Sequence, residues 1–329
     1  MFKLASMRCY SCGDEFTDEN RSEEHVINNA LGGHLTSNEL LCKPCNDGFG
    51  HGIDADIEGQ LGIFADSLGV KRHRENKNRK VRIEMVSETG ELKIVGKKMR
   101  PLHELSIDTG DKKVTLFEDE ARYEVLKNRK KKELSKKFKV EDKEYIRQPD
   151  KTRYNVKNSL SDKQGNIAFG GSGFFRAAAK MCLNYYLSKG YDIGFCKNVI
   201  AFVKGEKKVN DLAYFYYPAH YQIHDLGAEE VAHIIHIKGD THYKVLYAYI
   251  ELFSCHNAVV IFSMDYQGAA ISDTYAYDLI NSSVMEKAVT MRLPRHHLEI
   301  IDLIERDVHP RHLAKFNRLE QIIEKRQLL

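Results

Sequence analysis

The stretch that decides the fold of the N-terminal part reads SEEHVINNALGGH over residues 22–34, and it continues as SNELLCKPCN over residues 37–46. Two C-x2-C pairs bracket it: Cys9 with Cys12, and Cys42 with Cys45. Such pairs are typical of zinc knuckles, in which thiolates bind the ion at about 2.3 Å. Because no signal-peptide core precedes them, the four cysteines favour one structural zinc ion over disulfides.

The two pairs are separated by 29 residues, whereas a common zinc ribbon has roughly 15–20 residues there. A functional segment is therefore inserted between the knuckles. The order C-x2-C, E-H-V-I, L-G-G, asparagine and C-x2-C-N resembles HNH endonucleases that carry a ββα-metal motif inside a four-cysteine zinc site. The resemblance covers residues 9 to about 54.

The resemblance implies a role for each motif residue. Glu24 stands at the position that binds a divalent cation, and His25 at the position of the general base. Asn38 matches the asparagine that supports the histidine loop, and Asn46 matches the second protein ligand of the cation. The family often has proline where Asn28 follows the V-I pair, which we interpret as loop variation.

Two further residues compete for the last ligand position. His51 is the stronger rival of Asn46, and Asp54 is a weaker one. A carboxylate and an amide oxygen suit Mg²⁺ or Mn²⁺ and leave most of its shell to water and phosphate. A histidine near its ordinary pKa of about 6.5 can take a proton from water at neutral pH. We therefore expect one structural Zn²⁺ and one catalytic Mg²⁺ or Mn²⁺.

Charge is distributed unevenly along the chain. Residues 1–70 have 4 Lys/Arg against 12 Asp/Glu, whereas residues 71–139 have 22 against 12. The basic segment can bind phosphates without reading sequence, although a solvated linker explains its second run, residues 127–139, equally well. The expected nucleic-acid contacts are Lys71, Arg72, Arg74, Arg79, Lys80, Lys130, Lys131 and Lys132.

The second half of the chain has an ordinary globular composition. A glycine-rich turn before residues 177–188 leads into an apolar helix, and we interpret it as a packing turn because it lacks the end of a P-loop. The tail from residue 298, interrupted by Pro310, predicts two amphipathic helices. The remaining patterns predict strands at residues 199–203, 212–217, 231–238, 242–253 and 258–264, with one hairpin through Gly239-Asp240.

Histidines and single cysteines are frequent in this half. The pair His233 and His236 has no accompanying carboxylate and does not fit the two-residue period of one strand face, so a second catalytic metal centre is not expected. We assign these histidines, and the pairs 296–297 and 309/312, mainly to surface or partner contacts. Cys182, Cys196 and Cys255 stand among apolar residues and are expected to be buried thiols.

Length and composition set the domain organisation. The chain has 329 residues, of which 42% are hydrophobic and 29% charged, which excludes a mini-protein and extensive disorder. We predict an α+β protein with an HNH zinc module of treble-clef type at residues 1–70. A basic, β-containing extension follows at residues 71–150. An α+β domain with a mainly antiparallel sheet and C-terminal helices completes the chain at residues 151–329.

The expected function is that of a metal-dependent HNH DNA endonuclease leaving 5′-phosphate and 3′-hydroxyl ends, in a bacterial restriction or phage-defence role. The alternative is an inert zinc-dependent DNA-binding or regulatory protein. The substrate is expected to be duplex or branched DNA, and RNA stays open. The C-terminal domain is where a homodimer or a partner protein would bind. Without a run of about 18 apolar residues, no membrane association is expected, and we expect a cytoplasmic protein.

Overall fold

The computed structural model describes the chain in two compact units. The first combines Met1–Asn76 with Phe169–Leu329, and the second is Lys77–Ala168. The described residues are 8–74, 82–87, 90–95, 98–101, 105–108, 113–116, 170–207, 212–218, 221–301 and 309–327.

The N-terminal segment forms two very short strands and a helix. Strand β1 (Glu24–His25) pairs antiparallel with β2 (Thr36–Ser37), and helix α1 (Lys43–His51) follows. Cys42 is the N-cap residue of α1, and a proline stands in its first turn, where a missing N–H is tolerated. The second cysteine pair is therefore held at a helix start.

The L-G-G sequence has a structural explanation in the loop between β1 and β2. The 3-10 helix η1 (Asn29–Leu31) ends at Gly32, whose φ of 95° lies in the left-handed region, where glycine is favoured. A Cβ atom on Gly33 would overlap the carbonyl oxygen of Ile27. Both glycines are thus required by the backbone of the loop that follows the E-H-V-I sequence.

Helix α2 (Ile53–Leu68) follows α1 and ends the N-terminal segment. Its buried residues include Ile53, Ile57 and Leu61, which recur at every fourth position and so share one face. The helix ends at Gly69, which has a φ of 65° and donates its N–H to the last turn in the manner of a left-handed C-cap. Helix α2 packs against α1 and against helix α4.

The remainder of the first unit is built on a six-stranded sheet. The strands are ordered β13-β12-β9-β10-β11-β8, and every neighbouring pair is antiparallel. All residues of β10 and nearly all of β9 and β11 are buried, as expected for central strands covered on both faces. The strands are β8 (Ala213–Phe215), β9 (Ala232–Asp240), β10 (Val245–Leu252), β11 (His256–Ser263), β12 (Ile271–Asp278) and β13 (Ser283–Val284).

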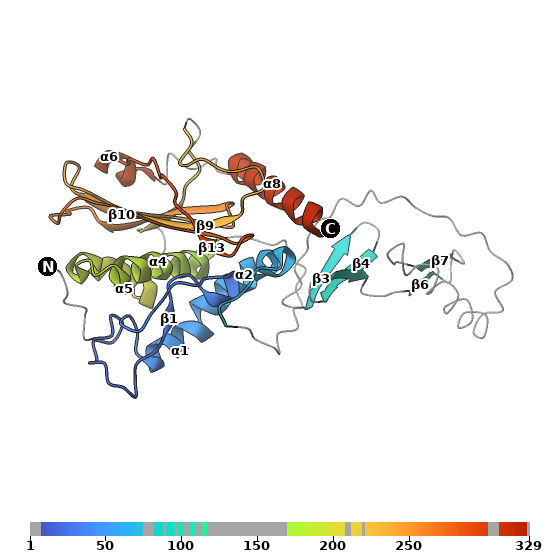
Figure 1. The fold of residues 1–329 in the computed structure, drawn as a ribbon, viewed down its shortest axis with the longest axis horizontal. Helices are drawn as coiled ribbons and strands as arrows, with labels where there is room; N and C mark the ends of the chain where they lie inside the picture. The colour runs from blue at the N-terminus through green and yellow to red at the C-terminus, as the bar shows by residue number, and fades with distance from the viewer. Residues whose placement is uncertain are drawn as a thin grey trace. The chain divides into compact units, whose positions relative to one another are not determined.

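Helix α4 (Gly171–Ser188) lies along one face of this sheet, and α6 (Arg295–Glu299) lies on the other side (Figure 1). Helix α4 is also covered by α2, so that residues 177–186 are all buried. A helix buried on most sides is enclosed between two layers. The 3-10 helix η2 (Ile193–Cys196), helix α5 (Lys197–Lys204) and the C-terminal helix α8 (His309–Gln327) complete the unit.

The structure corrects several expectations for this half. Residues 199–203, predicted as a strand, lie in helix α5, where Val199, Phe202 and Val203 form one buried face. Strand β12 was not predicted. The β9–β10 turn follows Asp240 rather than containing it, because Asp240 still pairs with Val245 of β10. The Asp240 carboxylate accepts the N–H groups of two turn residues.

The histidines of strand β9 are a further correction. His233 and His236 are buried, at 0% and 2% exposure, and are not surface residues. His233 accepts from the backbone N–H of Phe253 and bonds the Leu31 carbonyl, whereas His236 bonds Thr274. They serve packing between strands and between the sheet and η1. The single cysteines at 182, 196 and 255 are buried, as predicted.

The second unit contains two small antiparallel sheets. Strands β3 (Arg82–Ser87), β4 (Gly90–Val95) and β5 (Lys98–Pro101) form one, and β6 (Leu105–Asp108) and β7 (Lys113–Leu116) form the other. These strands confirm the β content expected for the basic segment. The expected nucleic-acid contacts Arg79, Lys80, Lys130, Lys131 and Lys132 lie outside the described residues.

Within the described part of the chain, no helix combines the length and the apolar character needed to cross a membrane.

Candidate metal centre and nuclease site

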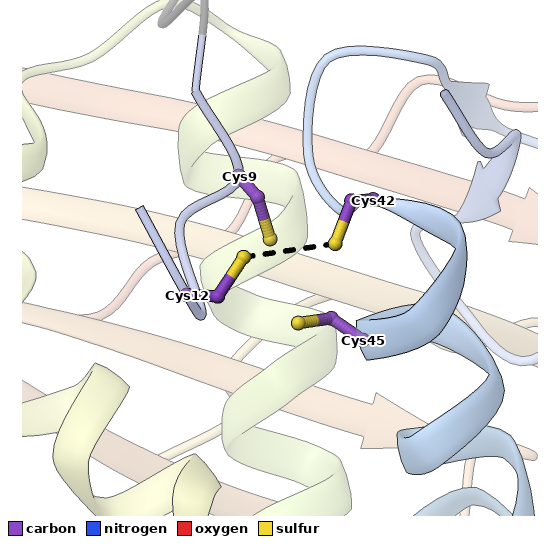
Figure 2. Close-up of side chains that lie close together, drawn as sticks. All are labelled: Cys9, Cys12, Cys42 and Cys45. Carbon is purple, nitrogen blue, oxygen red and sulfur yellow. Dashed lines mark hydrogen bonds between the residues drawn. The ribbon is translucent and has the colours of Figure 1, made fainter. Parts of the chain in front are cut away.

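The four knuckle cysteines converge on one point. Their sulfur atoms all lie within 4.8 Å of one another, and the Cys12 and Cys42 sulfurs are 3.6 Å apart. Four thiolates bound tetrahedrally at about 2.3 Å would place sulfurs about 3.8 Å apart. Figure 2 shows Cys9 and Cys12 reaching from the N-terminal loop toward Cys42 and Cys45 at the start of α1. The cluster is therefore compatible with one zinc ion.

The Cys45 thiol differs from that of an isolated cysteine. Burial raises the pKa of Cys45 to about 11. A bound zinc ion reverses this because it deprotonates a coordinating thiol outright. The donor set, four sulfurs from two knuckles, is that of a closed structural site rather than a catalytic one.

Glu24 points inward from β1 and is 4% exposed. Its Oε1 atom lies 2.6 Å from Nζ of Lys180 on helix α4 and accepts a hydrogen bond of 2.9 Å from Asn184, one turn further along α4. Asn184 in turn accepts from the Tyr10 hydroxyl at 3.0 Å. A buried polar network thus joins the E-H-V-I strand to the C-terminal part of the chain.

The same lysine also binds Asp54. Its Nζ lies 2.7 Å from Oδ2 of Asp54, in the first turn of α2. Burial acts to lower the pKa of Lys180, but the carboxylates of Glu24 and Asp54 outweigh it and raise that pKa. The ammonium group therefore stays charged at neutral pH and lies between the two carboxylates.

Two oxygen atoms of the expected cation ligands are not used by these contacts. Lys180 and Asn184 both bind Oε1 of Glu24, so Oε2 takes no part in them. Asn46 donates through Nδ2 to the Ser22 hydroxyl at 2.7 Å, which leaves its Oδ1 atom outside this hydrogen bond. A carboxylate oxygen and an amide oxygen are the donor types that a hard cation takes. The donor chemistry thus fits such an ion.

His25 lies on the opposite side of β1 from Glu24, as the alternation of a strand requires. It is half-buried, and its Nε2 atom lies 3.2 Å from Nδ1 of His73. Burial, then the positive charge of Arg74 and the imidazole of His73, lower the pKa of His25 to about 4. The imidazole is therefore neutral near pH 7, which is the form that can accept a proton.

The other predicted motif residues have simpler surroundings. Asn38 is exposed in the turn after β2. His51 is exposed at the end of α1, where Nδ1 donates to the Asp47 carbonyl at 2.7 Å. Asp54, the weaker rival, shares the ammonium group of Lys180 with Glu24.

Three of the expected nucleic-acid contacts lie in the described residues. Arg72 pairs with Asp66 and donates to the Ala30 carbonyl at 3.2 Å, so it fastens η1 to α2. Arg74 pairs with Glu23. The side chain of Lys71 is exposed, and its carbonyl bonds His34 at 3.0 Å.

Sequence reasoning missed the residues that hold this site in place. Lys180 and Asn184 are four residues apart in a run of apolar residues, so they share a helix face, and a buried lysine signals a buried partner. Asn28 caps η1 through the N–H of Ala30 at 2.8 Å. Asparagine is favoured at such caps, so this position could have been predicted from the A-L-G-G sequence after it.

Comparison with known families agrees with this geometry. Residues 9–61 match the family model described as HNH endonuclease. The match spans β1, β2, α1 and about half of α2, together with all four knuckle cysteines. The chain therefore carries an HNH endonuclease segment at its N-terminus, as the sequence predicted. No curated protein and no solved structure matches the chain.

Proposed function

We propose that this protein is a metal-dependent DNA endonuclease. The observation that carries the proposal is the neutral, half-buried imidazole of His25, next to Glu24 in the sequence, in a segment that matches HNH endonucleases. In this reaction His25 takes a proton from the attacking water. The sequence resemblance supplies the expected products, a 5′-phosphate and a 3′-hydroxyl.

Glu24 and Asn46 would hold the catalytic Mg²⁺ or Mn²⁺ through the oxygens that their hydrogen bonds leave unused. When bound, such an ion supplies Lewis-acid stabilisation of the scissile phosphate and of the leaving oxygen. Lys180 and Asn184 keep the Glu24 side chain in one orientation. Asn38 would support the loop that carries His25, as the resemblance implies. Asn28 would stabilise the loop after β1 through its cap of η1.

The proposed substrate is DNA, in line with the family match. Exposed Lys71 and the basic residues outside the described part would contact the phosphates. We further propose a restriction or phage-defence role in the cytoplasm, with the C-terminal domain mediating a homodimer or a partner contact. These finer assignments rest on the resemblance.

The deciding experiment is cleavage of supercoiled plasmid by the full chain. Wild type with Mg²⁺ or Mn²⁺ should give nicked or linear DNA, and EDTA should abolish the product. His25→Ala should leave the plasmid intact, whereas His242→Ala, at an exposed histidine in the β9–β10 turn, should cleave like wild type. Equal cleavage by His25→Ala would overturn the assignment of the base.

One observation favours a second function, that of an inert zinc-dependent DNA-binding protein. The Lys180 ammonium already neutralises Glu24, as a divalent cation would. If this second function is correct, the plasmid stays intact with every metal, while the protein still retards DNA on a gel.

A separate experiment distinguishes DNA from RNA as the substrate. An end-labelled RNA of the same sequence as a DNA substrate, tested in parallel, separates the two substrate classes.

A further inference from the structure

A second group of metal-ligating side chains lies at the contact between the sheet and the C-terminal helix. It consists of Cys255, His256 and His312, whose ligand atoms all lie within 4.8 Å of one another. Apart from the four knuckle cysteines, it is the one such group of three or more His, Cys, Asp or Glu residues in the described part of the chain. We call it the hairpin–helix cluster. It lies outside the residues matched to the HNH family.

The β10–β11 hairpin carries the first two residues of the hairpin–helix cluster. Cys255 is the last residue of the loop, and His256 begins β11. The loop is strained, since Phe253 and Ser254 have φ values of 57° and 51°, where side chains other than glycine are disfavoured. Such strain persists only where the surroundings fix the conformation.

A buried tyrosine fixes the backbone of this loop on both sides of His256. The Tyr217 hydroxyl donates to the Cys255 carbonyl at 3.0 Å and accepts from the Asn257 N–H at 3.0 Å. Cys255 also donates its own N–H to the Leu252 carbonyl at 3.1 Å. The positions of the thiol and of the first imidazole are therefore preset by the fold.

The third member comes from α8. His312 lies in the first turn of that helix and is half-buried, whereas Cys255 and His256 are 0% and 1% exposed. Its Nε2 atom lies 3.2 Å from Nδ1 of His256. Two imidazole nitrogens bound tetrahedrally to zinc at about 2.0–2.1 Å would stand about 3.3 Å apart. These two nitrogens therefore need almost no adjustment to bind one ion, and the Cys255 sulfur lies within 4.8 Å of them.

The surroundings of the cluster hold both rings and limit access by water. Phe64 of α2 lies 5.4 Å from the His256 ring, and Tyr217 lies 5.3 Å from the His312 ring, between ring centroids. The nearest lysine on α8, Lys315, is bound to buried Glu251 at 2.9 Å. Its positive charge is thus already compensated, which reduces its repulsion of a cation.

We propose that Cys255, His256 and His312 bind one zinc ion, with water as the fourth ligand on the side of half-exposed His312. One thiolate and two imidazoles are ligands that zinc takes readily. Because the ligands come from the hairpin and from α8, the ion would fasten the C-terminal helix to the sheet. The site is separate from the proposed nuclease site and does not depend on the assigned activity.

The test is the zinc content of the purified full chain, measured by plasma mass spectrometry against protein concentration. His312→Ala should hold one zinc per chain fewer than wild type, and Cys255→Ser should lose the same amount. His297→Ala, at an exposed histidine of α6, should keep the wild-type content. Equal zinc in wild type and both cluster variants would overturn the proposal.

A measurement on the wild type alone covers the case in which Cys255→Ser does not fold. Zinc X-ray absorption should show nitrogen ligands at about 2.0 Å in addition to sulfur at about 2.3 Å. In His312→Ala, chosen because this side chain is half-exposed, the nitrogen contribution should fall. A spectrum with sulfur ligands alone in wild-type protein would exclude zinc from the hairpin–helix cluster.

Discussion

The ammonium group of Lys180 lies 2.6 Å from Oε1 of Glu24, and both side chains are almost entirely buried. The two residues belong to α4 and β1, so the pair connects the sheet-covering helix to the HNH segment. A lysine this deeply buried is tolerated only when a partner of opposite charge compensates its ammonium group. The orientation of Glu24 in the HNH segment is thus set by a helix outside the matched residues.

Removal of this lysine should destabilise the fold strongly. Lys180→Ala leaves buried Glu24 and partly buried Asp54 without their cation, and breaking a buried ion pair costs about 3–5 kcal/mol. Urea unfolding of wild type and variant measures the difference. Lys204→Ala, which breaks the exposed pair with Glu206, should change the free energy of unfolding far less, because solvent screens an exposed pair. Similar losses in the two variants would contradict a structural role for the buried pair.

Zinc at the four-cysteine cluster should support folding of the N-terminal segment. Cys45→Ser removes one of four ligands, so we expect loss of one zinc per chain and a lower thermal midpoint, because binding of a structural zinc is coupled to folding. Cys182→Ala, at a buried cysteine outside both clusters, should retain all zinc. If a chelator lowers the midpoint of Cys45→Ser as much as that of wild type, the cluster is not the stabilising site.

Local patterns were enough to predict several parts of the fold. The cysteine spacing anticipated the cluster around Cys9 and Cys42, and the apolar run of residues 177–188 anticipated most of helix α4. The three central strands were also found, because continuous apolar runs of β-branched and aromatic residues distinguish them. Each of these signals is contained in a short window of sequence.

Long-range contacts set the parts that were missed. The sequence VIAFV in α5 is rich in β-branched residues, which favour a strand. In the structure its buried residues recur with helical spacing and pack against α4 and β11. The partnership of Lys180 with Glu24 joins segments that are distant in sequence, and no local pattern encodes it. For the same reason, the approach of His312 to the β10–β11 loop could not be predicted.

Stability should fall as the solution is acidified below the ordinary histidine range. Burial first, and then the charge of Lys238, lower the pKa of His236 to about 4 in the folded state, against about 6.5 when unfolded. The unfolded chain therefore binds the extra proton between these values. This favours unfolding by about 2 kcal/mol at pH 5 relative to pH 7. Buried His233, with its pKa also lowered to about 4 by burial, adds to the same trend.

A glutamine at position 236 removes this proton uptake while keeping a partner for Thr274. His236→Gln should therefore reduce the loss of stability between pH 7 and pH 5 by about 2 kcal/mol, as measured by urea unfolding at both pH values. His242→Gln, at the exposed turn histidine, should leave the wild-type dependence unchanged. A dependence as steep as that of wild type, or steeper, in His236→Gln would show that the pKa of this imidazole is not lowered in the folded state.

The lowered pKa of His25 also predicts the pH dependence of cleavage. With a pKa of about 4, the imidazole remains almost fully neutral at pH 6, whereas an ordinary histidine would be roughly one quarter neutral there. Single-turnover cleavage at saturating protein should therefore change little between pH 7.5 and pH 6 on account of this group. Arg74→Gln removes one charge that lowers this pKa, so its acid limb should move to higher pH. A wild-type rate that falls in proportion to a pKa near 6.5, unchanged by Arg74→Gln, would contradict this assignment.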